Sequence, residues 1–170
     1  RHFSETPDSI VAATIRLTSV VRAPQQVLFD LARSVDAHKA SATQTDEEAI
    51  AGTTEGLMRL GDEVTWRARH FGVLQTLTSR ITEFQSPIHF RDSMVSGAFK
   101  RFDHDHFFHL QSDGSVLMED VFDYAAPLGP LGWIAERLFL TAYMTRFLKK
   151  RNRALIEMAE SDEWRSFVDP

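Results

Sequence analysis

The most regular pattern in this chain is an alternation of side chains between residues 102 and 110. Alternate residues of an extended strand point to the same face. One face of this segment carries Phe102, His104, His106, Phe108 and Leu110. The turn residues Ser112-Asp113-Gly114 follow, and Gly114 can adopt the positive φ that a three-residue hairpin loop requires. The pattern therefore predicts a β-hairpin whose second strand covers residues 115–126.

The turn also fixes the pairing of the two predicted strands. If Gln111 pairs with Ser115, His106 faces Asp120. The same register places three further pairs opposite one another: His104 and Phe122, Phe108 and Met118, and Phe102 and Tyr124. Because most of this face is apolar, we expect it to point into the protein. The hairpin thus predicts two histidines and one aspartate buried among aromatic rings.

From Trp133 to Ala159 the chain contains no Pro or Gly and is rich in helix-forming residues. This segment predicts a helix roughly 40 Å long, after a corner at residues 127–132 that cannot continue a strand. One side of the helix collects Ile134, Leu138, Thr141, Met144, Thr145, Leu148, Asn152, Leu155, Ile156 and Ala159. The small and polar residues in the middle of this side predict space for a ligand rather than tight packing.

A second stripe on this helix is aromatic. Phe139, Tyr143 and Phe147 are spaced by four residues, on the face that we predict to lie opposite the ligand side. If that face meets solvent, the stripe predicts a contact with a protein partner or with a second copy of the chain. If the N-terminal segment or the C-terminal tail covers the stripe, it is part of the core.

The remaining pattern completes an α+β fold. The expected elements are a strand over residues 10–21, a helix from Ala23-Pro24 through Ala32, a short helix over 35–42, a weak edge strand over 43–53, and strands starting at Gly61, Val73 and His89. Hairpin-connected strands form an antiparallel sheet, and one long helix covers one face of it. We therefore expect six to seven strands curved around the C-terminal helix. Residues 1–170 form one expected domain, with a core at 10–159, a flexible lead-in at 1–8 and a tail at 161–170.

Composition narrows the classes of function. A net charge of −5 over 170 residues argues against a general nucleic-acid binder, which needs a basic face. The chain has no cysteine, so it has neither disulfides nor a thiolate nucleophile. No run approaches the ~18 apolar residues of a transmembrane helix, and no signal-peptide pattern is present. The expected location is the cytoplasm.

Several motifs resemble those of a known superfamily. They are Ala23-Pro24 with Val27 and Phe29, Ile81-Thr82-Glu83 before Pro87 and Phe90, Gly97-Ala98-Phe99, the segment 102–108, Asp120, Tyr124 and the corner 127–132. On these residues the chain resembles the START-like (SRPBCC, helix-grip) proteins, especially the bacterial branch of polyketide cyclase/dehydrase and lipid transport proteins. Coenzyme Q-binding START proteins are neighbours of that branch. The likeness spans residues 10–159 and is most specific from Gly97 to Gly132.

The resemblance implies a cavity for a hydrophobic small molecule such as a lipid, an isoprenoid quinone or a polyketide. It does not imply one activity, because this fold hosts binding, transport and catalysis. The sequence departs from the family in having Ala98 where Pro is common and Phe102 where Trp is common. Phe107, on the face predicted to point outward, is a further departure.

The best candidates for chemistry are His104, His106 and Asp120. As a catalytic group, His106 oriented by Asp120 would exchange a proton with a bound ligand, as a cyclase, aromatase or dehydratase requires. As structure, the three side chains form a buried hydrogen-bonded network. His-x-His with an aspartate is also a plausible metal-ligand set, but no fourth ligand can be placed, so we expect no metal and no cofactor.

The predicted ligand-binding set combines inward strand positions with one side of the helix. It consists of Trp66, Phe90, Asp92, Phe102, His104, His106, Asp120, Phe122, Tyr124, Leu138, Thr141, Thr145 and Leu148. Asp92 needs a buried partner, which we expect to be Arg80, Arg67 or the histidine pair. We predict that four further histidines, His38, His70, His89 and His109, lie on the surface and have no role. Three hypotheses result: a carrier of a hydrophobic molecule without chemistry of its own, a cyclase-type enzyme, or an interaction module.

Overall fold

The computed structural model describes residues 12–42, 45–126 and 133–168, and the side chains of the last range from Leu138 onward. The strands are β1 (Ala12–Val21), β2 (Glu48–Gly52), β3 (Glu63–His70), β4 (Val73–Gln85), β5 (His89–Ser96), β6 (Arg101–Leu110) and β7 (Val116–Ala125). The helices are α1 (Gln25–Ala32), α2 (Val35–Ser41) and α3 (Trp133–Glu160), followed by the 3-10 turn η1 (Glu163–Ser166). The lead-in predicted at 1–8 and the corner predicted at 127–132 lie outside the described residues.

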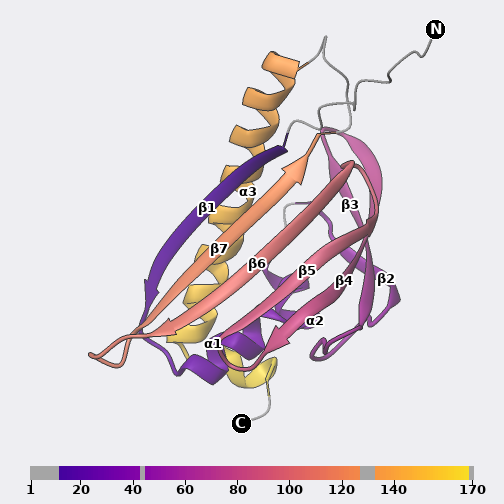
Figure 1. The fold of residues 1–170 in the computed structure, drawn as a ribbon. Helices are drawn as coiled ribbons and strands as arrows, with labels where there is room; N and C mark the ends of the chain where they lie inside the picture. The colour runs from indigo at the N-terminus through magenta and orange to yellow at the C-terminus, as the bar shows by residue number, and fades with distance from the viewer. Residues whose placement is uncertain (1–11, 43–44, 127–132, 169–170) are drawn as a thin grey trace, which may run out of the picture.

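The seven strands form one sheet in the order β1-β7-β6-β5-β4-β3-β2, and every neighbouring pair is antiparallel. The sheet curves around α3, and the short helices α1 and α2 lie near the C-terminal half of α3 (Figure 1). The predicted helix-grip architecture is therefore confirmed. The weak segment predicted at 43–53 is β2, and it occupies one edge of the sheet as expected.

The β6–β7 hairpin has the predicted register. Gly114 has φ +84°, and the Gln111 amide donates to the Ser115 carbonyl at 2.8 Å. His106 consequently faces Asp120, and His104 faces Phe122. These positions belong to the inner face of the sheet, since the two histidines and Asp120 are each 3% exposed.

The apolar core is divided into two clusters on the inner face. One is centred on Phe29 of α1, whose ring meets Phe84, Phe90 and Phe108 edge to face. The other contains Ile15, Phe102, Phe122, Tyr124 and Leu148. In the β6–β7 register, the His106–Asp120 pair lies between Phe108 of the first cluster and Phe102 of the second. A polar layer therefore separates the two apolar clusters.

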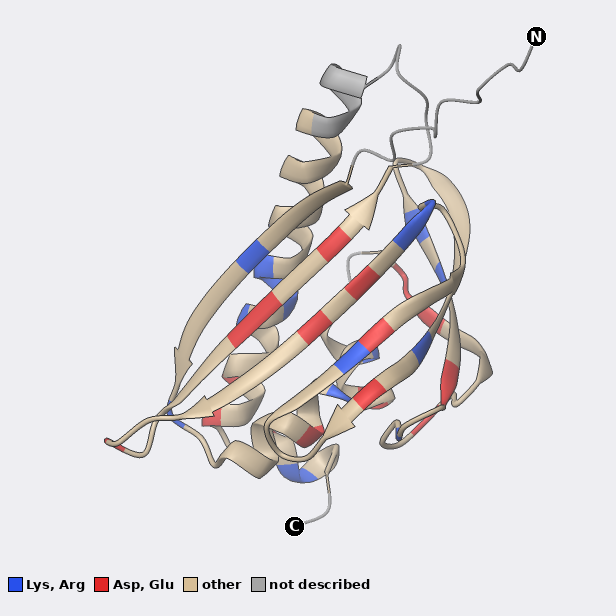
Figure 2. Ribbon diagram, viewed as in Figure 1, with Lys and Arg blue, Asp and Glu red and all other residues tan. Residues whose placement is uncertain are grey.

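The outer face of the sheet is charged. Acidic and basic residues mark the outward positions of β4, β5, β6 and β7 (Figure 2). The Arg91 guanidinium donates to both oxygens of Asp105 at 2.9 Å and to Glu83 at 2.7 Å. None of the helices in the described part of the chain is long and apolar enough to cross a membrane.

Candidate functional site

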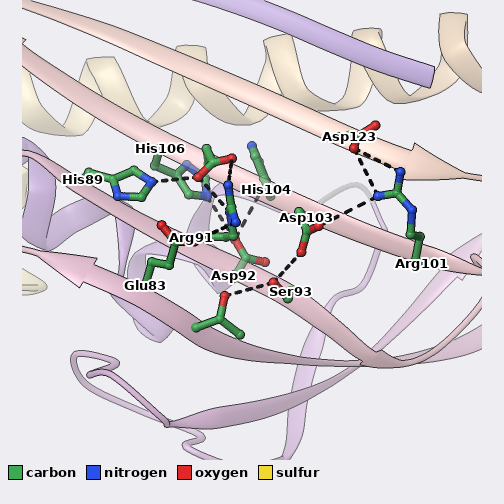
Figure 3. Close-up of polar contacts among 12 residues, drawn as sticks. Glu83, His89, Arg91, Asp92, Ser93, Arg101, Asp103, His104, His106 and Asp123 are labelled. Carbon is green, nitrogen blue, oxygen red and sulfur yellow. Dashed lines mark hydrogen bonds and ion pairs between the residues drawn. The ribbon is translucent and has the colours of Figure 1, made fainter. Parts of the chain in front are cut away.

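Three neighbouring strands bring the predicted polar residues together. Asp92 on β5 is paired with His104 on β6, and His106, two residues further, is paired with Asp120 on β7. Because alternate residues share a face, all four side chains point toward α3. Figure 3 shows Asp92, His104 and His106 beside one another. Of the partners expected for Asp92, the histidine pair is the one found, because Arg80 bonds to Glu63 and Arg67 to Glu48.

Asp120 is the centre of this cluster. Its Oδ1 forms a hydrogen bond with His104 Nε2 at 3.1 Å and an ion-pair contact with His106 Nδ1 at 2.8 Å. Its Oδ2 accepts from Asn152 Nδ2 of α3 at 2.5 Å. The second nitrogen of His106, Nε2, lies 3.0 Å from Asp92 Oδ1. The network is thus complete within the core, and it connects three strands to the helix.

Burial and hydrogen bonding act in opposite directions on the pKa values of Asp120 and His106. Burial alone would raise the pKa of Asp120, but the hydrogen bonds from His104 and His106 hold it well below its ordinary value. Burial acts to lower the pKa of His106, and its hydrogen bonds to Asp120 and Asp92 outweigh burial, so its pKa is raised. Burial and the neighbouring His106 lower the pKa of His104. Positive charge in the cluster is therefore favoured on His106, between the two carboxylates.

A large cavity lies elsewhere, between β3, β4 and the N-terminal half of α3. Its volume is about 370 Å³. It is lined by Glu47, Trp66, Ala68, His70, Phe71, Gln75, Thr76, Leu77, Ala98, Phe99, Phe139, Leu140, Tyr143, Met144 and Phe147. This wall is mainly aromatic and aliphatic, and it contains a few polar side chains. That combination is typical of sites for apolar small molecules.

Polar side chains in the wall of the large cavity form hydrogen-bonded pairs. Tyr143 Oη lies 2.7 Å from His70 Nδ1. Burial lowers the pKa of His70, so the neutral imidazole is favoured, and burial raises the pKa of Tyr143. Nearby, Glu47 bonds to His38 at 3.1 Å. Burial would raise the pKa of Glu47, but its charge and hydrogen-bond interactions with His38 lower it, with help from Arg151 and His70.

Phe71 lies over this cavity in an unusual backbone conformation. It is the first residue of the two-residue turn between β3 and β4, with φ +53°, and Gly72 follows with φ +74°. Its ring centroid is 4.4 Å from that of Tyr143 and 5.3 Å from that of Phe139. Phe71 and Phe139 remain 53% and 62% exposed, so they lie where the cavity meets the surface.

A smaller cavity of about 50 Å³ adjoins the polar cluster. Its lining includes Asp92, His106, His38, Arg151 and Trp66. Trp66 also lines the large cavity, so it borders both. The polar cluster therefore has an open side, but that side faces the small cavity.

The structure places the residues of the predicted ligand-binding set in several different surroundings. Among the described lining residues, Trp66 is the member of that set that reaches the large cavity. Phe102, Phe122, Tyr124 and Leu148 belong to the second core cluster instead. Thr141 bonds to the Tyr124 hydroxyl at 2.6 Å, Leu138 is 69% exposed, and Thr145 is half-buried away from this cavity. Phe90, Asp92 and His106 line the small cavity.

The prediction that the aromatic stripe of α3 faces away from the ligand side was wrong. Phe139, Tyr143 and Phe147 line the large cavity rather than the opposite face. The reason is the curvature of the sheet, which contacts the helix on more than one side. Leu148, Asn152 and Leu155 are buried on one side of α3, while the aromatic stripe faces β3 and β4.

Sequence reasoning also missed His70, Glu47 and Tyr143 as site residues. His38, His70 and His89 were predicted to lie on the surface without a role. Each is half-buried and bonded: His38 to Glu47, His70 to Tyr143 and His89 to Asp105. A signal for His70 was available. Trp66 and Ala68 alternate on the inner face of β3, and two residues further the same face reaches His70.

Comparison with known proteins gives the fold. No family model matches the chain, and no curated protein matches it. Among solved structures, the protein TTHA0849 from Thermus thermophilus is 15% identical, with a TM-score of 0.71 over 86% of this chain and 97% of that one. The Zhui aromatase/cyclase from Streptomyces sp. R1128 is 15% identical, with a TM-score of 0.70 over 88% and 94%. The ginseng major latex-like protein 151 from Panax ginseng is 12% identical, with a TM-score of 0.65 over 88% and 99%.

Proposed function

We propose that this protein binds a hydrophobic small molecule in the cavity between β3, β4 and α3. The observation that carries the proposal is the cavity itself, whose volume of about 370 Å³ suits a small ligand. The aromatic rings of Trp66, Phe99 and Phe147 supply apolar contact area in its wall. The aromatic stripe of α3 is thereby assigned to the ligand rather than to a protein partner.

The polar residues of the wall indicate what the ligand carries. Tyr143 and His70 are hydrogen-bonded to each other at 2.7 Å and both line the cavity. A hydroxyl or carbonyl group on the ligand would bond to this pair, while the rest of the molecule fills the apolar space. We therefore propose a largely apolar ligand with at least one hydroxyl or carbonyl group, a class that includes phenols, quinones and polyketides.

A second candidate function is acid–base chemistry on such a ligand. The same pair supports it, because a neutral imidazole accepts a proton and a phenol donates one. His106 and Asp120, the pair suggested by the sequence, are poorer candidates. Both nitrogens of His106 already bond to carboxylates, and neither residue is among those that line the large cavity. The likeness to an aromatase/cyclase, at 15% identity, concerns the fold.

Native mass spectrometry tests the binding proposal. Protein purified from its host should carry an apolar molecule, or should take up naphthalene or 1-naphthol added in solution. Met144→Trp should abolish uptake, because Met144 lines the cavity and a larger side chain would fill it. Leu138→Trp, on the exposed part of the same helix, is the matched control and should bind normally. Undiminished uptake by folded Met144→Trp protein would contradict the proposed location of the site.

A further inference from the structure

Three potential metal ligands converge beside the small cavity. Asp92 Oδ1, His104 and His106 each offer one ligand atom, and these atoms all lie within 4.8 Å of one another. His106 Nε2 is 3.0 Å from Asp92 Oδ1, and His104 Nδ1 is 3.9 Å from it. Ligand atoms about 2.0–2.1 Å from a tetrahedral zinc ion lie roughly 3.3 Å apart. The observed separations bracket that value.

Asp120 determines which way the imidazoles face. It bonds to His104 Nε2 and lies 2.8 Å from His106 Nδ1, so in the neutral tautomers that a metal ion requires each ring would place its single N–H on the side of this carboxylate. The remaining nitrogens, His106 Nε2 and His104 Nδ1, would then carry the lone pairs, and they lie 3.0 Å and 3.9 Å from Asp92 Oδ1. Two imidazole lone pairs and a carboxylate oxygen this close together repel one another unless a cation lies between them. A proton on His106 is the alternative to a metal ion at this position.

We propose that Asp92, His104 and His106 bind a divalent transition-metal ion of the zinc class. Two imidazole nitrogens and one carboxylate oxygen form a donor set that suits such ions. The hairpin pattern alone groups the two histidines with Asp120, and on that set no metal is expected. The fold instead supplies Asp92 from β5 as the third ligand, and Asp120 serves as the supporting carboxylate.

The surroundings meet two further requirements of a metal site. Metal-binding imidazoles usually donate their other N–H to a carboxylate, which fixes the ring, and Asp120 provides this for both rings while Asn152 holds its second oxygen. The small cavity of about 50 Å³ lies beside Asp92 and His106. It has room for a water molecule at an open coordination position.

A second cluster of similar composition, on the outer face of the sheet, provides the control. Glu83, His89 and Asp105 also lie within 4.8 Å of one another. There the Arg91 guanidinium bonds to both oxygens of Asp105 and to Glu83, so an arginine already supplies the positive charge (Figure 3). At the inner cluster Arg151 also lines the small cavity, but among the described contacts it forms no ion pair with Asp92, His104 or His106. We therefore assign the metal to the inner cluster alone.

The test is zinc binding by the full chain, stripped with a chelator and titrated with Zn²⁺ by calorimetry, with metal content measured after dialysis. We expect one ion per chain. Asp92→Asn and His104→Gln should each abolish binding, and Asp120→Asn should weaken it by roughly 10–100-fold. His89→Gln, in the outer cluster, should bind as the wild type does.

Two results would overturn the proposal. One is a folded wild-type protein that binds no Zn²⁺, which would leave a proton on His106 as the occupant. The other is binding that Asp92→Asn and His89→Gln affect equally. If the inner variants do not fold, measurements on the wild-type protein still test the proposal. Bound Co²⁺ should give the visible absorption of an ion ligated by nitrogen and oxygen. The imidazole NMR signals of two histidines should also shift when the metal binds. Uptake of naphthalene by the large cavity is measured separately, so failure of one proposal leaves the other intact.

Discussion

Asn152 on α3 donates its amide proton to Asp120 on β7, over 2.5 Å between nitrogen and oxygen. Both side chains are buried, at 7% and 3% exposure. This contact joins the long helix to the middle of the sheet through a charged group. It also explains why a polar residue lies on the buried side of a helix whose other buried positions there, Leu148 and Leu155, are apolar.

Asn152→Ala should therefore destabilise the protein. It leaves one oxygen of a buried carboxylate without its donor, a loss typically of about 1–3 kcal/mol. Urea denaturation followed by circular dichroism would measure the free energy of unfolding. Arg153→Ala, at the exposed position next to it, should change that free energy by less than about 0.5 kcal/mol. Equal stability of the two variants would show that the Asn152 contact is dispensable.

Phe71→Asn should make the protein more stable and a poorer binder. The β3–β4 turn has positive φ at both central residues, which Asn-Gly adopts readily and a bulky side chain does not. Relief of the left-handed conformation should raise the free energy of unfolding by about 1 kcal/mol. Loss of the ring beside Tyr143 and Phe139 should weaken uptake of naphthalene.

The same two measurements on Phe139→Asn separate the causes. Phe139 also borders the cavity but belongs to a helix, so no turn strain is relieved there. This variant should lose affinity without gaining stability. A gain in stability by both variants would mean that exposed aromatic surface, rather than the turn, is the source of the effect.

Glu47→Gln should flatten the pH dependence of stability in acid. The pKa of Glu47 is lowered in the folded protein from an ordinary value of 4.5, so the unfolded chain binds more protons between the two values. Its contribution is complete above the ordinary value and is lost as the pH falls through the folded pKa. The groups that face it are His38, His70, Arg151 and Tyr143. Thermal melts at stepped pH would show a shallower decline for Glu47→Gln, and the wild-type decline for the exposed control Glu55→Gln.

Tyr143→Phe should change which ligands bind rather than whether the cavity binds. The ring stays, but the hydroxyl that bonds to His70 is removed. We expect the affinity for 1-naphthol to fall roughly three- to tenfold, the value of one hydrogen bond, and the affinity for naphthalene to stay the same. Calorimetric titration of both compounds is the measurement. Equal losses for the two compounds would contradict a polar anchor at this position.

The fold could be predicted from local sequence patterns because each of these patterns is compatible with one local structure. The alternation of residues 102–110 and the turn at Gly114 together fix the register of β6 and β7. That register is sufficient to place His106 opposite Asp120. The partnership with Asp92 could not be fixed in the same way, since it depends on the register between β5 and β6 across a longer connection.

The position of the cavity could not be predicted for a different reason. Helical periodicity shows which residues share a side of α3, but not how far a curved sheet wraps around that helix. The small side chains of Thr141 and Thr145 suggested that this side of the helix leaves space for a ligand. In the structure, however, the Thr141 hydroxyl is hydrogen-bonded to the Tyr124 hydroxyl. The open space is bordered by Phe139, Tyr143 and Phe147 on α3 and by residues of β3 and β4 that include Trp66, Ala68 and Leu77.

Trp66 borders both cavities, and the His38 ring lies against it with centroids 4.2 Å apart. Indole emission responds to the polarity and charge around the ring, so this one residue can report optically on either cavity. With the other two tryptophans, Trp133 and Trp164, replaced by Phe, the chain would carry its own fluorescent sensor. Occupants of the apolar cavity and of the polar one would then be read as separate changes in one emission spectrum.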